Sequence, residues 1–101
     1  MWNYNYYIYI VTNPRKQVLY TGVTNDLKAR VIQHYNNRGN KSSFAGRYYC
    51  HHLIYYEHFT HIEHAIEREK EIENWRREKK EKLIKGFNPN WNFLESEFIY
   101  S

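Results

Sequence analysis

The sequence predicts a small α/β sandwich in which a mainly antiparallel, three-stranded sheet is flanked by three helices. Three observations support this prediction. Two runs rich in tyrosine and β-branched residues flank a turn near the start of the chain, a third apolar run follows near its middle, and apolar residues recur at helical spacing elsewhere. Because 101 residues suffice for one modest core, we expect a single domain over residues 1–101.

The first two strands are expected to form a hairpin. The runs on either side of the turn are β-branched and aromatic, and the turn itself, residues 13–16, reads Asn-Pro-Arg-Lys. A four-residue loop pairs Thr12 with Gln17, and counting back by twos then places Tyr9 directly opposite Tyr20. We therefore expect the two phenols to lie side by side on one face of the sheet.

A helix is expected after the hairpin, with N-cap candidates at residues 24–26. Its apolar stripe recurs at every fourth residue: Leu27, Val31 and Tyr35. Arg30 and His34 lie one residue off this stripe, so they line the flank of the helix and can reach the edge of the sheet. From these residues alone, a solvated arginine and a histidine at the helix end remain an alternative.

The middle of the chain contains a loop and the third strand. Residues 36–47 are polar, contain glycine and lack acidic side chains, which predicts a mobile surface loop that could clamp a nucleic-acid backbone. The third strand is expected over residues 48–57. Its apolar centre, residues 53–56, is nearly continuous, which predicts a central strand buried on both faces.

A second helix is expected to open at residues 60–63, Thr-His-Ile-Glu, which have the spacing of a capping box. Its apolar face contains Ile62, Ala65, Ile66 and Ile72. Glu69 falls within this face and Glu73 lies close to it, so burial would demand a partner for Glu69. That partner could be a basic side chain or a metal ion.

A basic third helix follows, with Gly86 as its expected C′ residue. The tail, residues 87–101, carries enough apolar mass to dock on the core: Trp91, Phe93, Leu94 and Phe98. The single cysteine, Cys50, excludes an internal disulfide and is expected to be a core or sheet residue. No apolar run has the length of a membrane span, so we expect a cytoplasmic protein with no membrane association.

The positive charge is concentrated early. Residues 1–50 hold seven basic and one acidic residue, a net charge of +6, whereas residues 51–101 carry −2. Basic surfaces beside aromatic residues are typical of nucleic-acid binders, because phosphate contacts supply most non-specific affinity. The candidate contacts are Lys28, Arg38, Lys41, Arg47, Arg76, Arg77, Lys79 and Lys80. The last four, on the basic helix, could equally form a solvated face.

Two triplets of the hairpin, Tyr7-Ile8-Tyr9 and Tyr20-Thr21-Gly22, are followed along the chain by Arg30, His34, Glu69 and a Pro-x-x-Asn pattern at residues 89–92. Together these motifs resemble the GIY-YIG nucleases. In their paired signature, Tyr7 stands in place of the usual glycine and Thr21 in place of isoleucine. Val23 stands where the repair branch of the family carries lysine. The segments 75–80 and 88–91 resemble a compact single-domain subgroup of endonucleases.

The resemblance implies a role for each matched residue. Tyr9 and Tyr20 would line the pocket, one of them as a base or water-positioning group; Arg30 would contact the scissile phosphate; His34 would tune or relay the tyrosine proton; Glu69 would bind Mg²⁺ or Mn²⁺; and Asn92 would be the pocket asparagine, with Asn88 and Asn90 as rivals. These groups suit phosphodiester hydrolysis, which needs a base, positive charge and usually a metal. A phenol becomes a useful base only if a cation lowers its pKa from about 10, as Arg30 or the metal could do.

The implied activity is that of a divalent-metal-dependent DNA endonuclease, structure-directed or weakly sequence-specific, with a role in DNA repair or recombination. The alternative is a non-catalytic nucleic-acid-binding module that keeps the fold. A structural zinc site is a further hypothesis, based on His51, His52, His58, His61 and His64. The sequence leaves open which DNA is cut, the oligomeric state, and whether a larger complex supplies specificity.

Overall fold

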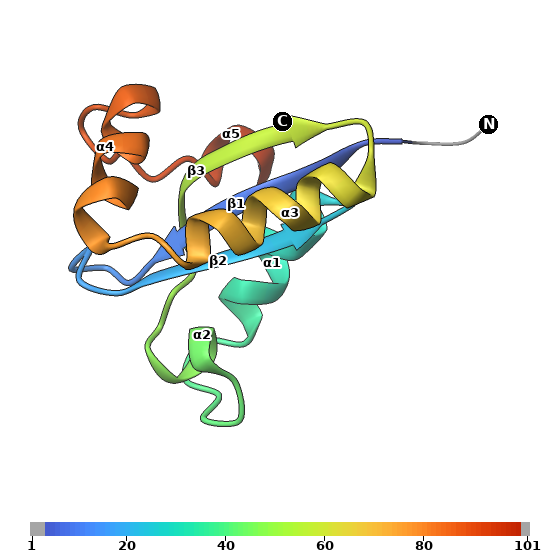
Figure 1. Ribbon diagram of the computed structural model, residues 1–101. Helices are drawn as coiled ribbons and strands as arrows, with labels where there is room; N and C mark the ends of the chain where they lie inside the picture. The colour runs from blue at the N-terminus through green and yellow to red at the C-terminus, as the bar shows by residue number, and fades with distance from the viewer. Residues whose placement is uncertain (1–3, 100–101) are drawn as a thin grey trace.

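The computed structural model describes residues 4–99 and confirms an α/β architecture with an antiparallel sheet. The strands are β1 (Tyr6–Thr12), β2 (Leu19–Thr24) and β3 (His52–Phe59), in the order β2-β1-β3. β1 is therefore the central strand, with antiparallel neighbours on both sides (Figure 1). The prediction of a central third strand is wrong, because β3 lies at an edge.

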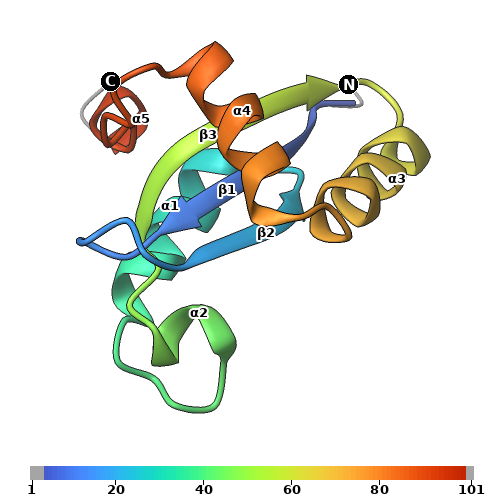
Figure 2. The ribbon, with the colours of Figure 1, turned by 60° about the vertical axis from the view of Figure 1, so that its left-hand side comes forward.

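Helices cover both faces of this sheet (Figures 1 and 2). They are α1 (Leu27–Asn36), α2 (Phe44–Arg47), α3 (Ile62–Glu73), α4 (Arg77–Phe87) and α5 (Ser96–Ile99). Ile8 and Ile10 of β1 pack against α3 and α4, whereas Tyr9 and Val11 pack toward α1. This alternation along one strand divides the core into two layers. Within residues 4–99, no helix has both the length and the apolar character that a membrane crossing requires.

The continuous apolar run of β3 has a local explanation. The pairing of β1 with β3 is interrupted by a bulge between Ile10 and Val11. Ile54 and Tyr55 are consecutive, yet both pack in the layer beneath α3, while Leu53 packs in the opposite layer. A bulge disturbs the alternation of side chains, and helices cover both faces, so an edge strand here is as apolar as a central one.

The hairpin has a longer loop than predicted. Lys16 N donates to Asn13 O over 2.9 Å, which closes the expected turn. The side chain of Asn13 then accepts hydrogen bonds from Gln17 N and Val18 N at 2.7 and 2.9 Å. These bonds keep two further residues out of β2. The register therefore shifts by two residues.

The shift changes the partners of the tyrosines but not their face. Tyr9 pairs with Gly22, and Tyr20 pairs with Val11. The prediction that the two tyrosines are directly opposed is therefore wrong. The prediction that they share a face is confirmed, because side chains two residues apart on a strand point the same way.

The ends of the helices only partly follow the sequence signals. Asp26 caps α1 as predicted, its carboxylate accepting a hydrogen bond from Ala29 N at 3.0 Å. The capping box at residues 60–63 is not formed, because His61 is the N-cap of α3 and makes no side-chain capping bond. Gly86 is not a C′ residue either: it lies within α4, which Asn88 terminates.

Two other segments are more ordered than the sequence suggested. The expected loop over residues 36–47 contains α2, capped by Ser43, whose Oγ accepts a hydrogen bond from Gly46 N at 3.1 Å. The third strand begins only at His52. The tail docks on the core as predicted, with Leu94 and Phe98 packed against the layer that contains Tyr9 and Val11.

Candidate active site

The candidate site begins at Tyr9 of the central strand β1, whose side chain lies over Gly22 of the edge strand β2. A Cβ atom at Gly22 would lie 2.3 Å from Tyr9 Oη and 2.5 Å from Tyr9 Cζ. Only glycine leaves room for the ring to pass so closely over the neighbouring strand. The ring is completely buried, with 0% of its surface exposed, and it brings its hydroxyl to α1.

Two side chains of α1 hold the Tyr9 hydroxyl. Arg30 Nε donates a hydrogen bond to Tyr9 Oη at 2.9 Å, and Tyr9 Oη lies 2.9 Å from His34 Nε2. A guanidinium only donates, so the single phenol proton is free for His34. The arrangement is satisfied when Tyr9 donates to an unprotonated Nε2 of His34.

Burial fixes the protonation of this pair. It raises the pKa of Tyr9 to about 12, and the hydrogen bond and charge of Arg30 oppose the shift without cancelling it. Burial also lowers the pKa of His34 to about 4, and the charge of Arg30 lowers it further. At neutral pH, Tyr9 is a protonated phenol and His34 a neutral imidazole. Arg30 alone therefore does not lower the pKa of the Tyr9 phenol, since desolvation dominates, and which of Tyr9 and Tyr20 acts as the base stays a prediction.

Tyr20 borders the surface of the same cluster. Its ring centroid lies 6.5 Å from that of Tyr9 and 5.5 Å from that of His34. Unlike Tyr9 it is only half-buried, and it lines a pocket of about 160 Å³ between β2, α1 and α2. The lining residues are Tyr20, Arg30, His34, Asn37, Ser43, Phe44 and Ala45. We call this cavity the β2-edge pocket.

Arg30 supplies the positive charge of the β2-edge pocket. Burial disfavours its charge, but the phenol oxygens of Tyr9 and Tyr20 outweigh burial, and the pKa of the guanidinium is raised. Its Nη1 donates to Gln33 Oε1. Arg30 is therefore a fixed cation on the pocket wall, and α1 and β1 both hold it in place.

Glu69 lies in the other layer of the molecule and is not among the residues that line the β2-edge pocket. It lies on α3, which packs across β1 and β2 on the face opposite α1 (Figure 1). Burial, and then the neighbouring carboxylate of Glu73, raise the pKa of Glu69. Its charge also contributes to the raised pKa of Tyr9. The predicted metal ligand is thus linked to Tyr9 by its charge and not by a direct contact.

The donor set at Glu69 fits a hard divalent cation. The carboxylate of Glu73, one helical turn away, raises the cost of ionising Glu69, and a cation with oxygen ligands relieves that cost. Mg²⁺ needs only one or two protein carboxylates, since water and substrate phosphates complete its shell. Zinc fits less well, because among residues 4–99 no three His, Cys, Asp or Glu side chains converge as a zinc site requires. The histidine-based zinc hypothesis has no support in the described residues.

The C-terminal asparagines lie at the other edge of the sheet. Asn88 is buried, and its Nδ2 donates to Ile54 O at 3.0 Å and to Asn92 O at 2.9 Å. Its Oδ1 accepts from Asn92 N at 3.0 Å. The side chain of Asn92 is exposed beside β3, with β1 between it and the β2-edge pocket. The structure therefore does not bring Asn92 to the pocket, and Asn88 holds the tail in place.

The predicted phosphate contacts fall into two groups. Lys28, Arg38, Lys41 and Arg47 are exposed on α1 and on the segment around α2. The others lie on or beside α4: Arg76, Arg77, Lys79 and Lys80. There, Arg77 donates to Gln17 O and Lys16 O and pairs with Glu81, and Lys79 lies 4.3 Å from the centroid of Trp75. These two side chains already have partners within the protein.

Sequence reasoning missed part of the pocket wall. Asn37, Ser43 and Phe44 line the β2-edge pocket but belong to the segment predicted as a loop. The available signal was the absence of acidic residues from that segment combined with an isolated phenylalanine. Periodicity could not reveal α2, because four residues are too few to show a helical pattern.

A tyrosine-centred pocket between a hairpin and the following helix is the arrangement that the resemblance to the GIY-YIG nucleases implies. The family model described as "GIY-YIG catalytic domain" matches residues 5–82, and the chain belongs to the GIY-YIG family. Within that family it is similar to small proteins named UPF0213. A UPF0213 protein of Staphylococcus saprophyticus is 40% identical over 79 residues, which cover 78% of this chain and 93% of the relative.

Two further similar proteins also carry the name UPF0213. A UPF0213 protein of Staphylococcus epidermidis is 41% identical over 66 residues, covering 65% of this chain and 78% of the relative. The solution NMR structure of the UPF0213 protein BH0048 from Bacillus halodurans is 32% identical, with a TM-score of 0.50 over 79% of this chain and 82% of that one. The family and the fold predicted from the sequence are thus confirmed.

Proposed function

We propose that this protein is a DNA endonuclease that hydrolyses phosphodiester bonds with the help of Mg²⁺ or Mn²⁺. The observation that carries the proposal is the fixed cation Arg30 on the wall of the β2-edge pocket, bonded to Tyr9 at 2.9 Å and bordered by Tyr20. A positioned guanidinium stabilises the charge that develops on phosphate during hydrolysis. Membership of the GIY-YIG family supports the same reaction.

The two tyrosines take different roles in this proposal. Tyr20 is half-buried in the pocket wall, so its phenol is the group that contacts the phosphate or orients the attacking water. Tyr9 is fully buried and stays protonated, so it acts as a positioning residue for Arg30 and His34. His34, being neutral, can accept the hydrogen bond from the Tyr9 hydroxyl without adding a charge that competes with Arg30.

Glu69 would hold the divalent cation, together with the neighbouring Glu73. The cation, when bound, would neutralise charge on the leaving oxygen. The basic residues of α1 and of the segment around α2 would contact the backbone of the DNA, which favours weakly sequence-specific or structure-directed cleavage. Asn92 would play no part in the reaction, because it lies at the β3 edge.

The test is nicking of supercoiled plasmid by the full chain with Mg²⁺ or Mn²⁺, compared for wild type and Glu69→Gln. We expect Glu69→Gln to bind DNA nearly as well as wild type while turnover is lost. Glu73 cannot serve as the control, because its carboxylate acts directly on Glu69. Glu67→Gln is the matched control: it is exposed on the same helix, two residues before Glu69.

The outcomes separate the proposed enzyme from its main rival. Nicking that is chelator-sensitive, lost in Glu69→Gln and retained in Glu67→Gln supports the endonuclease. Equal nicking by wild type and Glu69→Gln would show contamination or a different metal ligand. A folded wild type that binds DNA but never nicks it would identify a non-catalytic nucleic-acid-binding module.

A further inference from the structure

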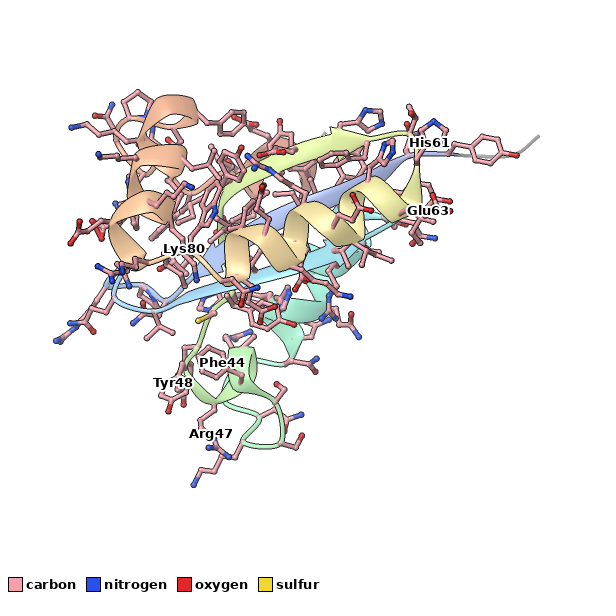
Figure 3. The ribbon with its side chains drawn as sticks, viewed as in Figure 1. Phe44, Arg47, Tyr48, His61, Glu63 and Lys80 are labelled. Atoms are coloured by element: carbon pink, nitrogen blue, oxygen red, sulfur yellow. The ribbon has the colours of Figure 1, made fainter. Side chains whose placement is uncertain are left out.

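An exposed row of aromatic rings leads out of the β2-edge pocket. Phe44 lines the pocket, yet 53% of its surface is exposed, and Tyr48 is 43% exposed beside it. Both rings lie on the segment of residues 37–50 around α2, which we call the α2 lobe. This lobe projects away from the sheet, and Phe44, Arg47 and Tyr48 lie together on it (Figure 3). Large apolar rings exposed side by side mark an interaction surface.

The row is continuous with the candidate active site. The Tyr20 and Phe44 rings stack with their centroids 6.3 Å apart and their planes at 27°. The Phe44 and Tyr48 centroids are 4.9 Å apart. A nucleotide whose phosphate enters the pocket beside Arg30 would therefore meet Phe44 with its base.

The row is also held in place by its own backbone. Gly39 N donates to Gly46 O at 2.8 Å, and Cys50 N donates to Ala45 O at 2.8 Å. A Cβ atom at Gly46 would lie 2.5 Å from Asn40 O, which shows how closely the lobe folds on itself. A platform fixed before binding loses less conformational entropy when a ligand stacks on it.

The charge around the row suits a polyanion rather than an apolar protein surface. Residues 27–56 contain five basic residues and no acidic one: Lys28, Arg30, Arg38, Lys41 and Arg47. None of the five takes part in the ion pairs found within residues 4–99. Uncompensated cations beside aromatic faces are the combination that binds nucleic-acid strands, with phosphates on the cations and bases on the rings.

We propose that Phe44 and Tyr48 stack on an unpaired base beside the cleaved phosphate, so that the substrate is DNA with at least one unpaired nucleotide at the site of cleavage. This inference rests on the proposed function and names its substrate class. A base inside an intact duplex has both faces covered by its neighbours and offers no face to Phe44. Only a bulged, gapped or single-stranded nucleotide does.

Fluorescence anisotropy of the full chain, without divalent metal so that nothing is cut, tests this directly. The probes are an intact labelled duplex, the same duplex with a short single-stranded gap, and the gapped duplex with abasic sugars in the gap. Because stacking of one base is worth about a tenfold change in affinity, wild type should bind the gapped duplex about tenfold more tightly than the other two probes.

Protein variants identify the rings responsible. Phe44→Leu keeps apolar volume but removes the aromatic face, so its affinity for the gapped duplex should fall to that for the abasic one. Phe44→Trp should keep the preference. Tyr49→Asn is the matched control, because Tyr49 is 51% exposed in the same lobe but lies outside the row, and asparagine tolerates its φ of 58°.

Equal binding of the gapped and abasic probes by wild type, or an undiminished preference in Phe44→Leu, would overturn the inference and leave the endonuclease proposal intact. If Phe44→Leu fails to fold, the wild-type abasic comparison and Phe44→Trp still decide. Loss of the preference in Phe44→Trp would also overturn it. Absence of binding to all three probes would refute the proposed function itself.

Discussion

Polar side chains lie along both edges of the sheet, but the β3 edge is covered by the tail and the β2 edge carries a pocket. The β3 edge is closed by the tail: Asn88 donates to Ile54 O, Leu94 N donates to Leu53 O at 2.7 Å, and Glu95 accepts a hydrogen bond from Leu53 N at 3.0 Å. The β2 edge instead carries the pocket, with Tyr20 and Arg30 on its wall. At β3 the polar side chains of the tail bind the strand backbone, whereas at β2 the side chains of Tyr20 and Arg30 line the pocket.

The contrast explains why spacing alone cannot assign a function to a polar residue. Asn92 matches a family pattern, yet it lies beside the closed edge, where its neighbour Asn88 makes three hydrogen bonds. Arg30 also matches a pattern, and its guanidinium lies on the wall of a pocket. The same kind of evidence in the sequence thus leads to a structural residue at one edge and a candidate catalytic residue at the other.

The largest expected effect comes from exchanging one polar residue at each edge. Arg30→Ala should reduce nicking by about 100-fold or more, because it removes a fixed cation from the developing phosphate charge. Asn92→Ala should change nicking by less than about twofold, as an exposed substitution away from the site does. Plasmid nicking at matched protein concentration measures both, with thermal melting to confirm folding. Equal losses in the two variants would break the distinction between the edges.

The buried histidine should make the β2 edge sensitive to acid. His34 has a pKa of about 4 in the folded chain against 6.5 as its ordinary value, so the unfolded chain binds more protons between these limits. The stability it contributes is complete above pH 6.5 and is lost as the pH falls toward 4, about 3 kcal/mol over the window.

Urea unfolding at pH 7 and pH 4.5 measures this dependence. The difference in unfolding free energy between the two pH values should shrink in His34→Gln, which has no titrating ring. It should persist in His64→Gln, which replaces an exposed histidine on α3. An unchanged pH dependence in His34→Gln would show that other groups cause the acid sensitivity.

One glycine of the hairpin should tolerate no side chain, while another glycine should accept one. Gly22→Ala places a methyl group 2.3 Å from Tyr9 Oη, and we expect a loss of about 2 kcal/mol from overpacking. Gly86→Ala has nothing within 4 Å and lies within α4, so it should stabilise by about 0.5–1 kcal/mol through helix propensity. Chemical denaturation of both variants checks the signs, and a stable Gly22→Ala protein would contradict the close passage of Tyr9.

At the closed edge, a loss smaller than that of Gly22→Ala is expected. Asn88→Ala removes three hydrogen bonds and leaves the buried Ile54 O without the donor Asn88 Nδ2, which should cost about 1–2 kcal/mol of stability. Asn90→Ala, exposed two residues later, should change stability by less than about 0.5 kcal/mol. Denaturation gives both values. Loss of plasmid nicking by a folded Asn88→Ala protein at matched concentration would assign the β3 edge a functional role.

Local sequence determined the three strands, the longer helices and the part of the site that β1, β2 and α1 carry. Asp26 could be recognised as the cap of α1 because capping involves only a few neighbouring residues. Tyr9 and Tyr20 could be placed on one face even with the register misjudged, since a two-residue error preserves the face of a strand. The spacing of Arg30 and His34 then followed from the helix that carries both.

Tertiary structure decided which of these residues are buried and which lie open. Tyr35 belongs to the predicted apolar stripe but is 49% exposed, whereas His34 is 4% exposed, because Tyr9 offers it a hydrogen-bond partner. The central position of β1 depends on β3 pairing with a strand some 40 residues earlier, which no local pattern encodes. The β3 edge is closed and the β2 edge open because the tail docks on only one of them, through contacts of residues 88–95 with residues 52–54 of β3, which are distant in the sequence.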